Sequence, residues 1–126
     1  FKIDYEISKI KSKYTDVGAV SIFIGYVRDI NQNNYVKSLD IEVYNKMAIK
    51  ELESICSTAK KKWLLIDYLV IHRYGELSLS EKIVLVATFA EHRKDSFESC
   101  NFIMNYLKKD APFWKKEYYK EKSIWL

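Results

Sequence analysis

The sequence has little of what marks several large classes of protein. Its 126 residues include one proline, three glycines and two cysteines. The glycines form neither a phosphate-binding loop nor a dinucleotide-binding fingerprint, and no serine lies in a GxSxG turn. No apolar run reaches the roughly 18 residues of a membrane span. These absences argue against P-loop and dinucleotide-binding enzymes, against serine hydrolases of the GxSxG type and against a membrane partner.

Thiol and imidazole groups are also scarce. Cys56 and Cys100 have no CxxC partner and lie on the expected inner faces of helices, so we expect buried, inert thiols. Free thiols and the lack of a secretory leader at Phe1 predict a reducing, cytoplasmic location. His72 and His92 are the only histidines, too few for most metal sites, and we expect neither a metal nor a cofactor.

The sequence is rich in apolar residues, and its positive charge is clustered. With 48% hydrophobic and 15% aromatic residues, residues 1–126 can form one packed domain. The net charge is +4, and residues 108–122 alone contribute +3, from six lysines against three acids. Such a patch suits a phosphate, a carboxylate or an acidic partner protein.

Hydrophobic periodicity predicts helices and strands in the order α-β-β-α-β-β-α. We expect a helix in the first dozen residues, one after an N-cap at Asn45, and one that opens with a capping box at Asp95 and Glu98 and ends before Pro112. The last helix has an expected inner face of Phe97, Cys100, Ile103, Met104 and Leu107. The expected strands are 19–27, 36–44, 64–73 and 82–90, with a loop at 29–34, a turn at 75 and a tail after 114 that ends in a short strand at 123–126. This order favours an α+β domain, with helices covering a mostly antiparallel sheet.

Two positions at the ends of expected strands are candidates for binding an anion. His92 and Arg93 follow the strand 82–90, where loops often carry functional groups, or they form a surface pair at the sheet edge. Arg28 follows the first strand and could bind a phosphate through its planar guanidinium, or pair with Asp29 or Glu42.

The lysines near the C-terminus have two interpretations as well. Lys108 ends the helix whose inner face carries Met104. It could be a reactive amine, or it could be a cation that is favoured at a helix C-terminus. Lys115, next to Trp114, could transfer protons, whereas Lys115 and Lys116 could equally belong to a solvated tail.

Several motifs in order resemble one protein family along nearly the whole chain. They are GAVSIFIGYVRD (18–29), LDIEVYNKMA (39–48), VIHRYGEL (70–77), the His-Arg pair at 92–93, FESCNFIMNYLK (97–108) and APFWKKE (111–117). Together they are similar to the large, catalytic subunit of molybdopterin synthase. The resemblance implies an α/β hammerhead-type fold and a homodimer within a heterotetramer.

The same resemblance implies an activity and partners. A small β-grasp subunit carries a thiocarboxylate on its C-terminal Gly-Gly tail, and its sulfur passes to cyclic pyranopterin monophosphate to form the dithiolene of molybdopterin. By position, Lys108 and Lys115 look like the two active-site lysines. Arg28, His92, Arg93, Met104 and Lys116 look like the lining of the substrate pocket, with the His-Arg pair supplied by the neighbouring subunit.

Two other functions fit parts of the sequence. A non-catalytic module that binds a β-grasp protein would share the fold but have a decayed pocket, against which the retained lysines argue. A small RNA-binding domain would use the basic, aromatic C-terminal residues, but the sequence holds no recognised RNA-reading motif, so no nucleic-acid partner is expected.

Overall fold

The structure is a computed structural model that describes the backbone of residues 2–26, 30–31, 34–43, 45–73, 75–78, 80–109, 113–119 and 123–125. Side chains are described for residues 2–26, 50–73, 78 and 80–108. This part of the chain contains the helices α1 (Ile3–Lys11), α2 (Asn45–Lys62) and α3 (Arg93–Lys109). Its strands are β1 (Ala19–Tyr26), β2 (Ile30–Asn31), β3 (Asn34–Val43), β4 (Asp67–His72), β5 (Gly75–Ser78), β6 (Lys82–Ala90), β7 (Phe113–Tyr119) and β8 (Ser123–Trp125).

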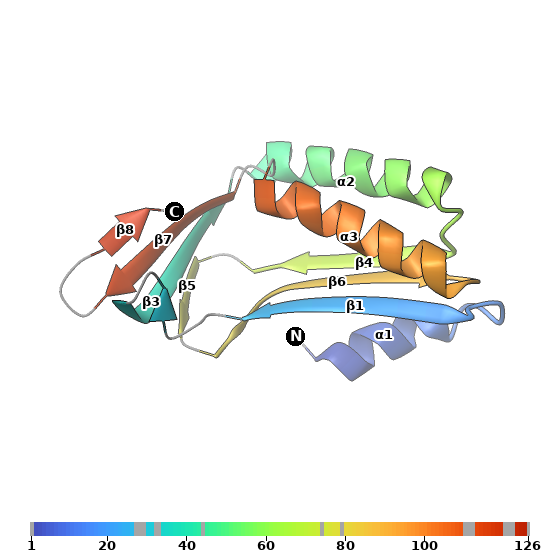
Figure 1. Ribbon diagram of the computed structural model, residues 1–126, viewed down its shortest axis with the longest axis horizontal. Coiled ribbons are helices and arrows are strands. Elements are labelled where there is room, and N and C mark those ends of the chain that lie inside the picture. The colour runs from blue at the N-terminus through green and yellow to red at the C-terminus, as the bar shows by residue number, and fades with distance from the viewer. Residues whose placement is uncertain are drawn as a thin grey trace.

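The first layer of the fold is a sheet of β1, β6 and β4, in that order, with both pairings antiparallel. Helices α2 and α3 cover one face of it and α1 covers the other (Figure 1). Strand β6 lies in the middle. Its Val84 and Val86 pack with α2 and α3, while Ala87 and Phe89 pack with Ile10 of α1. Burial on both faces explains why β6 is mostly apolar, and it confirms the predicted central strand.

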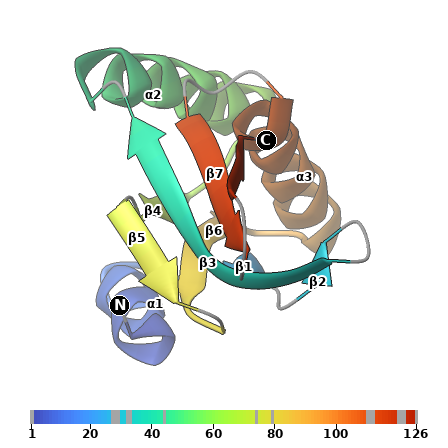
Figure 2. The same ribbon diagram turned by 90° about the vertical axis from the view of Figure 1, so that its left-hand side faces the viewer.

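A second antiparallel sheet lies at one end of this layer (Figure 2). Strand β3 pairs with β5 on one side and with β7 on the other, and β7 pairs with β8. Ile41 of β3 therefore lies between Gly75 of β5 and Lys115 of β7. The described pairings are all antiparallel, which confirms the predicted α+β class.

Three predictions about the second sheet are wrong. Gly75 is not simply a turn but opens β5, and most of the expected tail after Trp114 belongs to β7. The run FWKKEYY of β7 is rich in aromatic residues, which suit a strand, and it becomes one because β3 offers a free edge. The predicted loop at 29–34 likewise contains β2, which forms a hairpin with β3. The short strand predicted near the C-terminus is confirmed as β8.

Three predicted boundaries also shift. Strand β4 begins at Asp67 rather than Leu64, because Leu64 adopts φ 51° just after α2, a left-handed conformation that ends helices. Helix α3 begins at Arg93, so Asp95 lies inside its first turn and is not an N-cap. Asn45 is likewise the first residue of α2 rather than a residue before it.

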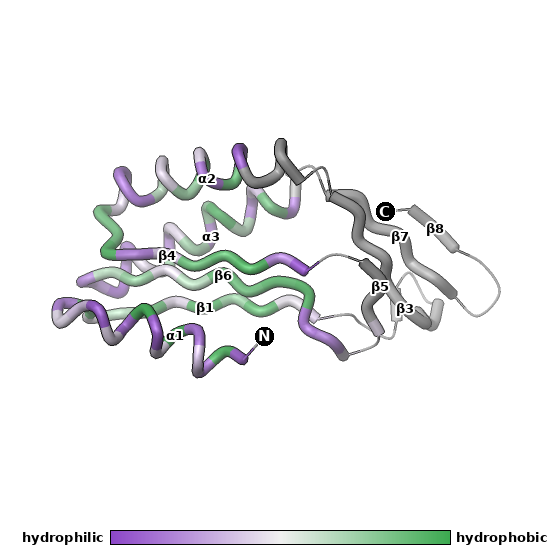
Figure 3. Tube along the Cα trace, turned by 180° about the vertical axis from the view of Figure 1, so that it is seen from behind, coloured by the Kyte–Doolittle hydropathy of each residue, from purple (hydrophilic) through white to green (hydrophobic). Residues whose placement is uncertain are grey.

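The core agrees with the hydropathy of the chain. Figure 3 shows apolar colour concentrated in β6 and β4 and polar colour on the outer turns of the helices. Cys56 and Cys100 lie in the core between α2, α3 and the sheet, as predicted, with 1% and 7% exposure. Among the described residues, no helix is long and apolar enough to cross a bilayer.

Candidate active site

The predicted site residues on helix α3 lie at its two ends. His92 directly precedes the helix and Arg93 is its first residue, and both side chains are exposed. Lys108 lies in the last turn, at the end of α3 that approaches the second sheet (Figure 1). The structure thus places an imidazole and a guanidinium group at one end of a helix and one amine at the other.

An exposed stripe leads along α3 to Lys108. Phe97, Asn101, Met104 and Lys108 recur at helical spacing, and Met104 is partly buried against the core. Phe97 is 62% exposed, so its predicted place on the inner face is wrong. The inner face uses buried serines at 96 and 99 instead, beside Cys100, Ile103 and Leu107. Lys108 is exposed and Met104 flanks it one turn earlier, an arrangement suited to a reactive amine beside an apolar wall.

Strand β7 carries the other two predicted lysines. Lys115 lies opposite Ile41 of β3, and Lys116 lies opposite Asp40. β7 begins four residues after α3 ends, which places its first residues next to the end of α3 that bears Lys108 (Figure 1). The backbone at 115 and Lys108 therefore belong to the same end of the molecule. The side chains of Lys115 and Lys116, and Arg28 as a whole, lie outside the described residues.

Within one chain, Arg93 and Lys108 lie far apart on α3. Arg93 and Lys108 are fifteen positions apart on one helix. At about 1.5 Å per residue, their backbones are roughly 22 Å apart along the axis. The His92–Arg93 end and the Lys108 end therefore lie at opposite ends of α3 within one chain.

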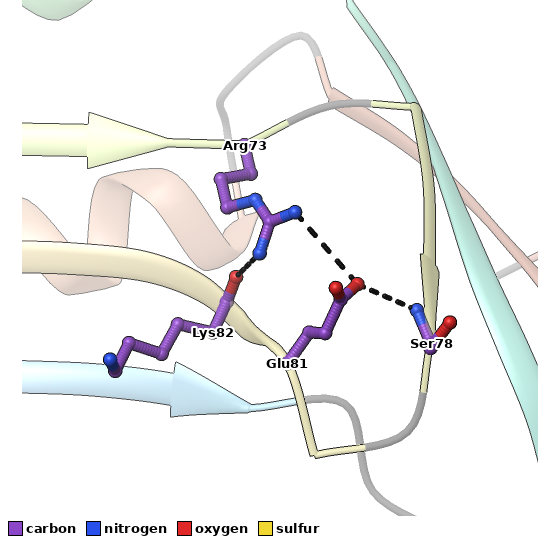
Figure 4. A network of polar contacts seen from close by, with 4 residues as sticks. All are labelled: Arg73, Ser78, Glu81 and Lys82. Carbon is purple, nitrogen blue, oxygen red and sulfur yellow. Dashed lines mark hydrogen bonds and ion pairs between the residues drawn. The ribbon is translucent and has the colours of Figure 1, made fainter. Parts of the chain in front are cut away.

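The junction between the two sheets is fixed by a polar network that the sequence analysis did not identify (Figure 4). Arg73 Nη1 donates to the carbonyl of Lys82 at 3.2 Å, and its Nη2 lies 3.8 Å from Glu81 Oε2. The same carboxylate oxygen accepts the backbone N–H of Ser78 at 2.8 Å. These contacts join the end of β4 to β5 and the start of β6, so they orient β5, on which β3 and then β7 are built. The only signal in the sequence was the Arg73 of the VIHRYGEL motif.

The two thiols are poorly suited to act as nucleophiles. Burial raises the pKa of Cys56 and that of Cys100 to about 11, so both are protonated near neutral pH. Among the described residues, no group of His, Cys, Asp and Glu side chains is placed to bind a metal ion. The absence of a metal from the reaction remains a prediction.

A pocket of about 370 Å³ lies between α2 and β4, away from these residues. It is lined by Leu52, Glu53, Cys56, Tyr68, Leu69 and Val70. None of the predicted site residues contributes to it, and its lining is mainly apolar. We therefore do not assign a substrate to this pocket.

Comparison with known proteins identifies the family. The family model described as MoaE protein matches residues 2–110. The molybdopterin synthase catalytic subunit of Ralstonia nicotianae is 44% identical over 126 residues, covering 100% of this chain and 72% of that protein. The structure of the molybdopterin biosynthesis MoaE protein of Burkholderia ambifaria matches with a TM-score of 0.85 at 40% identity, covering 100% of this chain and 82% of that one.

A more distant structure supports the fold alone. It is a complex of subunits 1 and 2 of the molybdopterin-converting factor of Helicobacter pylori, with a TM-score of 0.78 at 21% identity over 98% of this chain and 84% of that one. The predicted family and fold are thus confirmed by sequence and by structure. This chain belongs to the MoaE family, whose curated relatives are molybdopterin synthase catalytic subunits.

Proposed function

We propose that this chain, a molybdopterin synthase catalytic subunit by family, transfers sulfur from a thiocarboxylated β-grasp subunit to cyclic pyranopterin monophosphate. The observation that carries the proposal is the 44% identity to a curated catalytic subunit over the whole chain. The chemistry of the described residues supports it. The sulfur donor and the substrate are both anionic, and the candidate residues are amines, guanidinium groups and an imidazole.

Lys108 and Lys115 are the proposed catalytic residues. An amine beside the reacting carbon can donate or accept a proton as the pterin ring opens and water leaves. A second amine can neutralise the negative charge that develops as the thiocarboxylate sulfur attacks. The exposure of Lys108 at the end of α3 leaves its amine accessible to a partner tail. The buried, protonated thiols of Cys56 and Cys100 agree with a reaction in which the sulfur arrives on the partner.

The other candidates are assigned to the binding of the substrate anion. Arg28, His92, Arg93 and Lys116 would contact the phosphate or the thiocarboxylate, and Met104 would form a wall of the pocket. The separation of Arg93 and Lys108 along α3 supports a pocket shared between two copies of the chain. In a two-fold dimer, the His92–Arg93 end of one copy can approach the Lys108 end of the other.

The proposed assembly is a homodimer with one small subunit at each end, a heterotetramer. The related Helicobacter pylori protein is described as a complex of two subunits, which is consistent with a small partner. We propose that residues 1–126 act as one domain and that the reaction takes place in the cytoplasm, where free thiols such as Cys56 and Cys100 persist.

A reconstitution tests the proposal. The chain is incubated with a thiocarboxylated β-grasp subunit and cyclic pyranopterin monophosphate, and dithiolene product is measured. Product is expected, whereas a non-catalytic binding module would form a complex with the small subunit and yield none. A domain that binds RNA instead would show affinity for generic RNA that falls steeply with salt.

A further inference from the structure

The start of α3 rests on a cluster of buried hydroxyl groups, which we call the serine–threonine cluster. Its members are Ser21 of β1, Thr88 of β6, and Ser96 and Ser99 of α3, with exposures of 7%, 0%, 1% and 0%. Buried hydroxyls are unusual in a core of this size and must be hydrogen-bonded. All four donate in this structure, so the cluster is fully satisfied.

Ser96 is the centre of this cluster. Its Oγ donates to the backbone carbonyl of Arg93 at 2.8 Å, and its backbone N–H donates to the carbonyl of His92 at 3.3 Å. The same Oγ accepts the hydroxyl of Ser21 at 2.8 Å, and the carbonyl of Ser96 accepts the hydroxyl of Thr88 at 2.7 Å. One residue therefore connects the backbone of both His92 and Arg93 to strands β1 and β6.

The segment just before His92 is fixed independently. Gly18 donates its N–H to the carbonyl of Ala90 at 2.9 Å. The Cα of Gly18 lies so close to the carbonyl of Glu91 that any side chain at position 18 would overlap its oxygen. Gly18 thus holds the backbone at Ala90 and Glu91, just before His92, and Ser96 holds the backbone at His92 and Arg93.

These hydrogen bonds are relevant to binding because the side chains of His92 and Arg93 are exposed. A cation on a mobile surface turn loses much of its binding energy to the entropy of being ordered. Here the backbone that carries His92 and Arg93 is held by buried hydrogen bonds from two strands, so these side chains start from a fixed base. Preorganised groups bind an anion more tightly than the same groups on an unanchored loop.

We propose that Ser96 and Ser21 are positioning residues, which hold His92 and Arg93 in the geometry that binds the substrate anion. The inference rests on the proposed function, because it assumes that His92 and Arg93 contact the substrate. The competing explanation is that the cluster only stabilises the packing of α3 on the sheet. Ser99 separates the two explanations, since it is equally buried but donates within α3, to the carbonyl of Ser96 at 3.2 Å.

The experiment compares Ser96→Ala, Ser21→Ala and the matched control Ser99→Ala in the reconstituted synthase. The KM for cyclic pyranopterin monophosphate is expected to rise about tenfold in Ser96→Ala, as for one lost contact to a charged group, with a smaller change in kcat. Ser21→Ala should raise it less, because Ser96 still donates to Arg93, and Ser99→Ala should leave it unchanged. In an Arg93→Ala background, Ser96→Ala should raise the KM by a smaller factor than in the wild type, because the part of its effect that passes through Arg93 is already lost.

A second measurement does not depend on catalysis. The chain has two histidines, so the ring signals of His92 can be assigned by carbon–proton NMR with His92→Ala. These signals should move in Ser96→Ala and Ser21→Ala but not in Ser99→Ala. Ser21→Ala serves alone if Ser96→Ala fails to fold.

Unchanged His92 signals in folded Ser96→Ala and Ser21→Ala would overturn the inference, as would a rise in KM that adds fully to that of Arg93→Ala. A wild-type KM in Arg93→Ala itself would instead remove Arg93 from the proposed function, and the His92 signals would still decide whether Ser96 positions this end of α3.

Discussion

Gly18 and Glu91 approach each other so closely that the carbonyl oxygen of the glutamate occupies the space where a side chain at position 18 would begin. The contact is between two backbone segments, so neither can yield by rotating a side chain. It joins the start of β1 to the end of β6 and fixes the chain that leads into His92.

Gly18→Ala is therefore expected to destabilise the protein by about 2 kcal/mol or more, as overpacking at a rigid site does. The free energy of unfolding in urea measures the change. Gly25→Ala is the comparison, because its added methyl would meet the Cγ1 methyl of Val84 at 2.9 Å, and a side chain can move where a backbone cannot. A Gly18→Ala protein as stable as the wild type, or more stable than Gly25→Ala, would contradict this account of the contact.

Lys108→Ala should leave the fold and the dimer intact and nearly abolish product formation with the thiocarboxylated partner. The side chain is exposed, so the free energy of unfolding should change by no more than about 0.5 kcal/mol. Lys60→Ala removes another exposed lysine, on α2, and should retain full activity. Wild-type turnover in Lys108→Ala would remove Lys108 from the catalytic residues.

Arg28→Ala should chiefly weaken the binding of cyclic pyranopterin monophosphate. A guanidinium that forks onto a phosphate contributes binding to the substrate, so its loss should raise the dissociation constant by roughly tenfold or more. Titration calorimetry of the dimer with the substrate measures this constant. An unchanged dissociation constant would assign Arg28 to the alternative role, an ion pair with a neighbouring carboxylate.

The two thiols make the stability depend on alkaline pH. Burial raises the pKa of Cys56 and that of Cys100 from an ordinary value of 9.0 to about 11. Between these values the unfolded chain loses protons that the folded chain keeps. The contribution of the two protonated thiols to the free energy of unfolding is therefore complete below about pH 9 and is lost as the pH rises toward 11.

Urea unfolding at pH 8 and pH 10 checks this dependence, with a Cys56→Ala/Cys100→Ala protein as the control, whose stability should fall less between the two values. Iodoacetamide should also alkylate the native thiols slowly at pH 8. Rapid alkylation of the folded protein would show that these thiols are neither buried nor protonated.

The hydropathy pattern of the sequence predicted those strands and helices whose own residues determine their structure. The mostly apolar sequence of β6 predicted a central strand, and His92 and Arg93 were correctly placed just after its end. The strand β7 was missed because its charged residues resemble a solvated tail until β3 supplies an edge to pair with, which is a non-local contact. The start of α3 was misplaced by three residues, since the predicted N-cap was Asp95 and the residue before the helix is His92. Ser96 bonds back to Arg93, whereas the acidic pattern at Asp95 imitated a cap.

The site was predicted by resemblance more than by geometry. Periodicity placed Lys108 at the end of its helix and Met104 one turn before it, and both positions are confirmed. Periodicity predicted neither the buried serine–threonine cluster, because serine carries no apolar signal, nor the Arg73–Glu81 junction, because its partners come from three different segments. The resemblance implied that the His-Arg pair comes from the neighbouring subunit. We keep this as a proposal because Arg93 and Lys108 lie at opposite ends of α3.

The claim on which the account most depends is that each site takes Lys108 from one copy and Arg93 from the other. Lys108→Ala and Arg93→Ala proteins are unfolded together and refolded as a mixture. The mixture is assayed for dithiolene product at a concentration of cyclic pyranopterin monophosphate near the wild-type KM and well below the KM of Arg93→Ala, where each parent alone forms little product. If the site is shared, a mixed dimer has one site with both lesions and one with none. About half of the dimers are mixed at equal amounts, so about a quarter of the wild-type rate should return. If both residues act within one chain, every site carries a lesion, and a mixture as inactive as its parents would contradict the account.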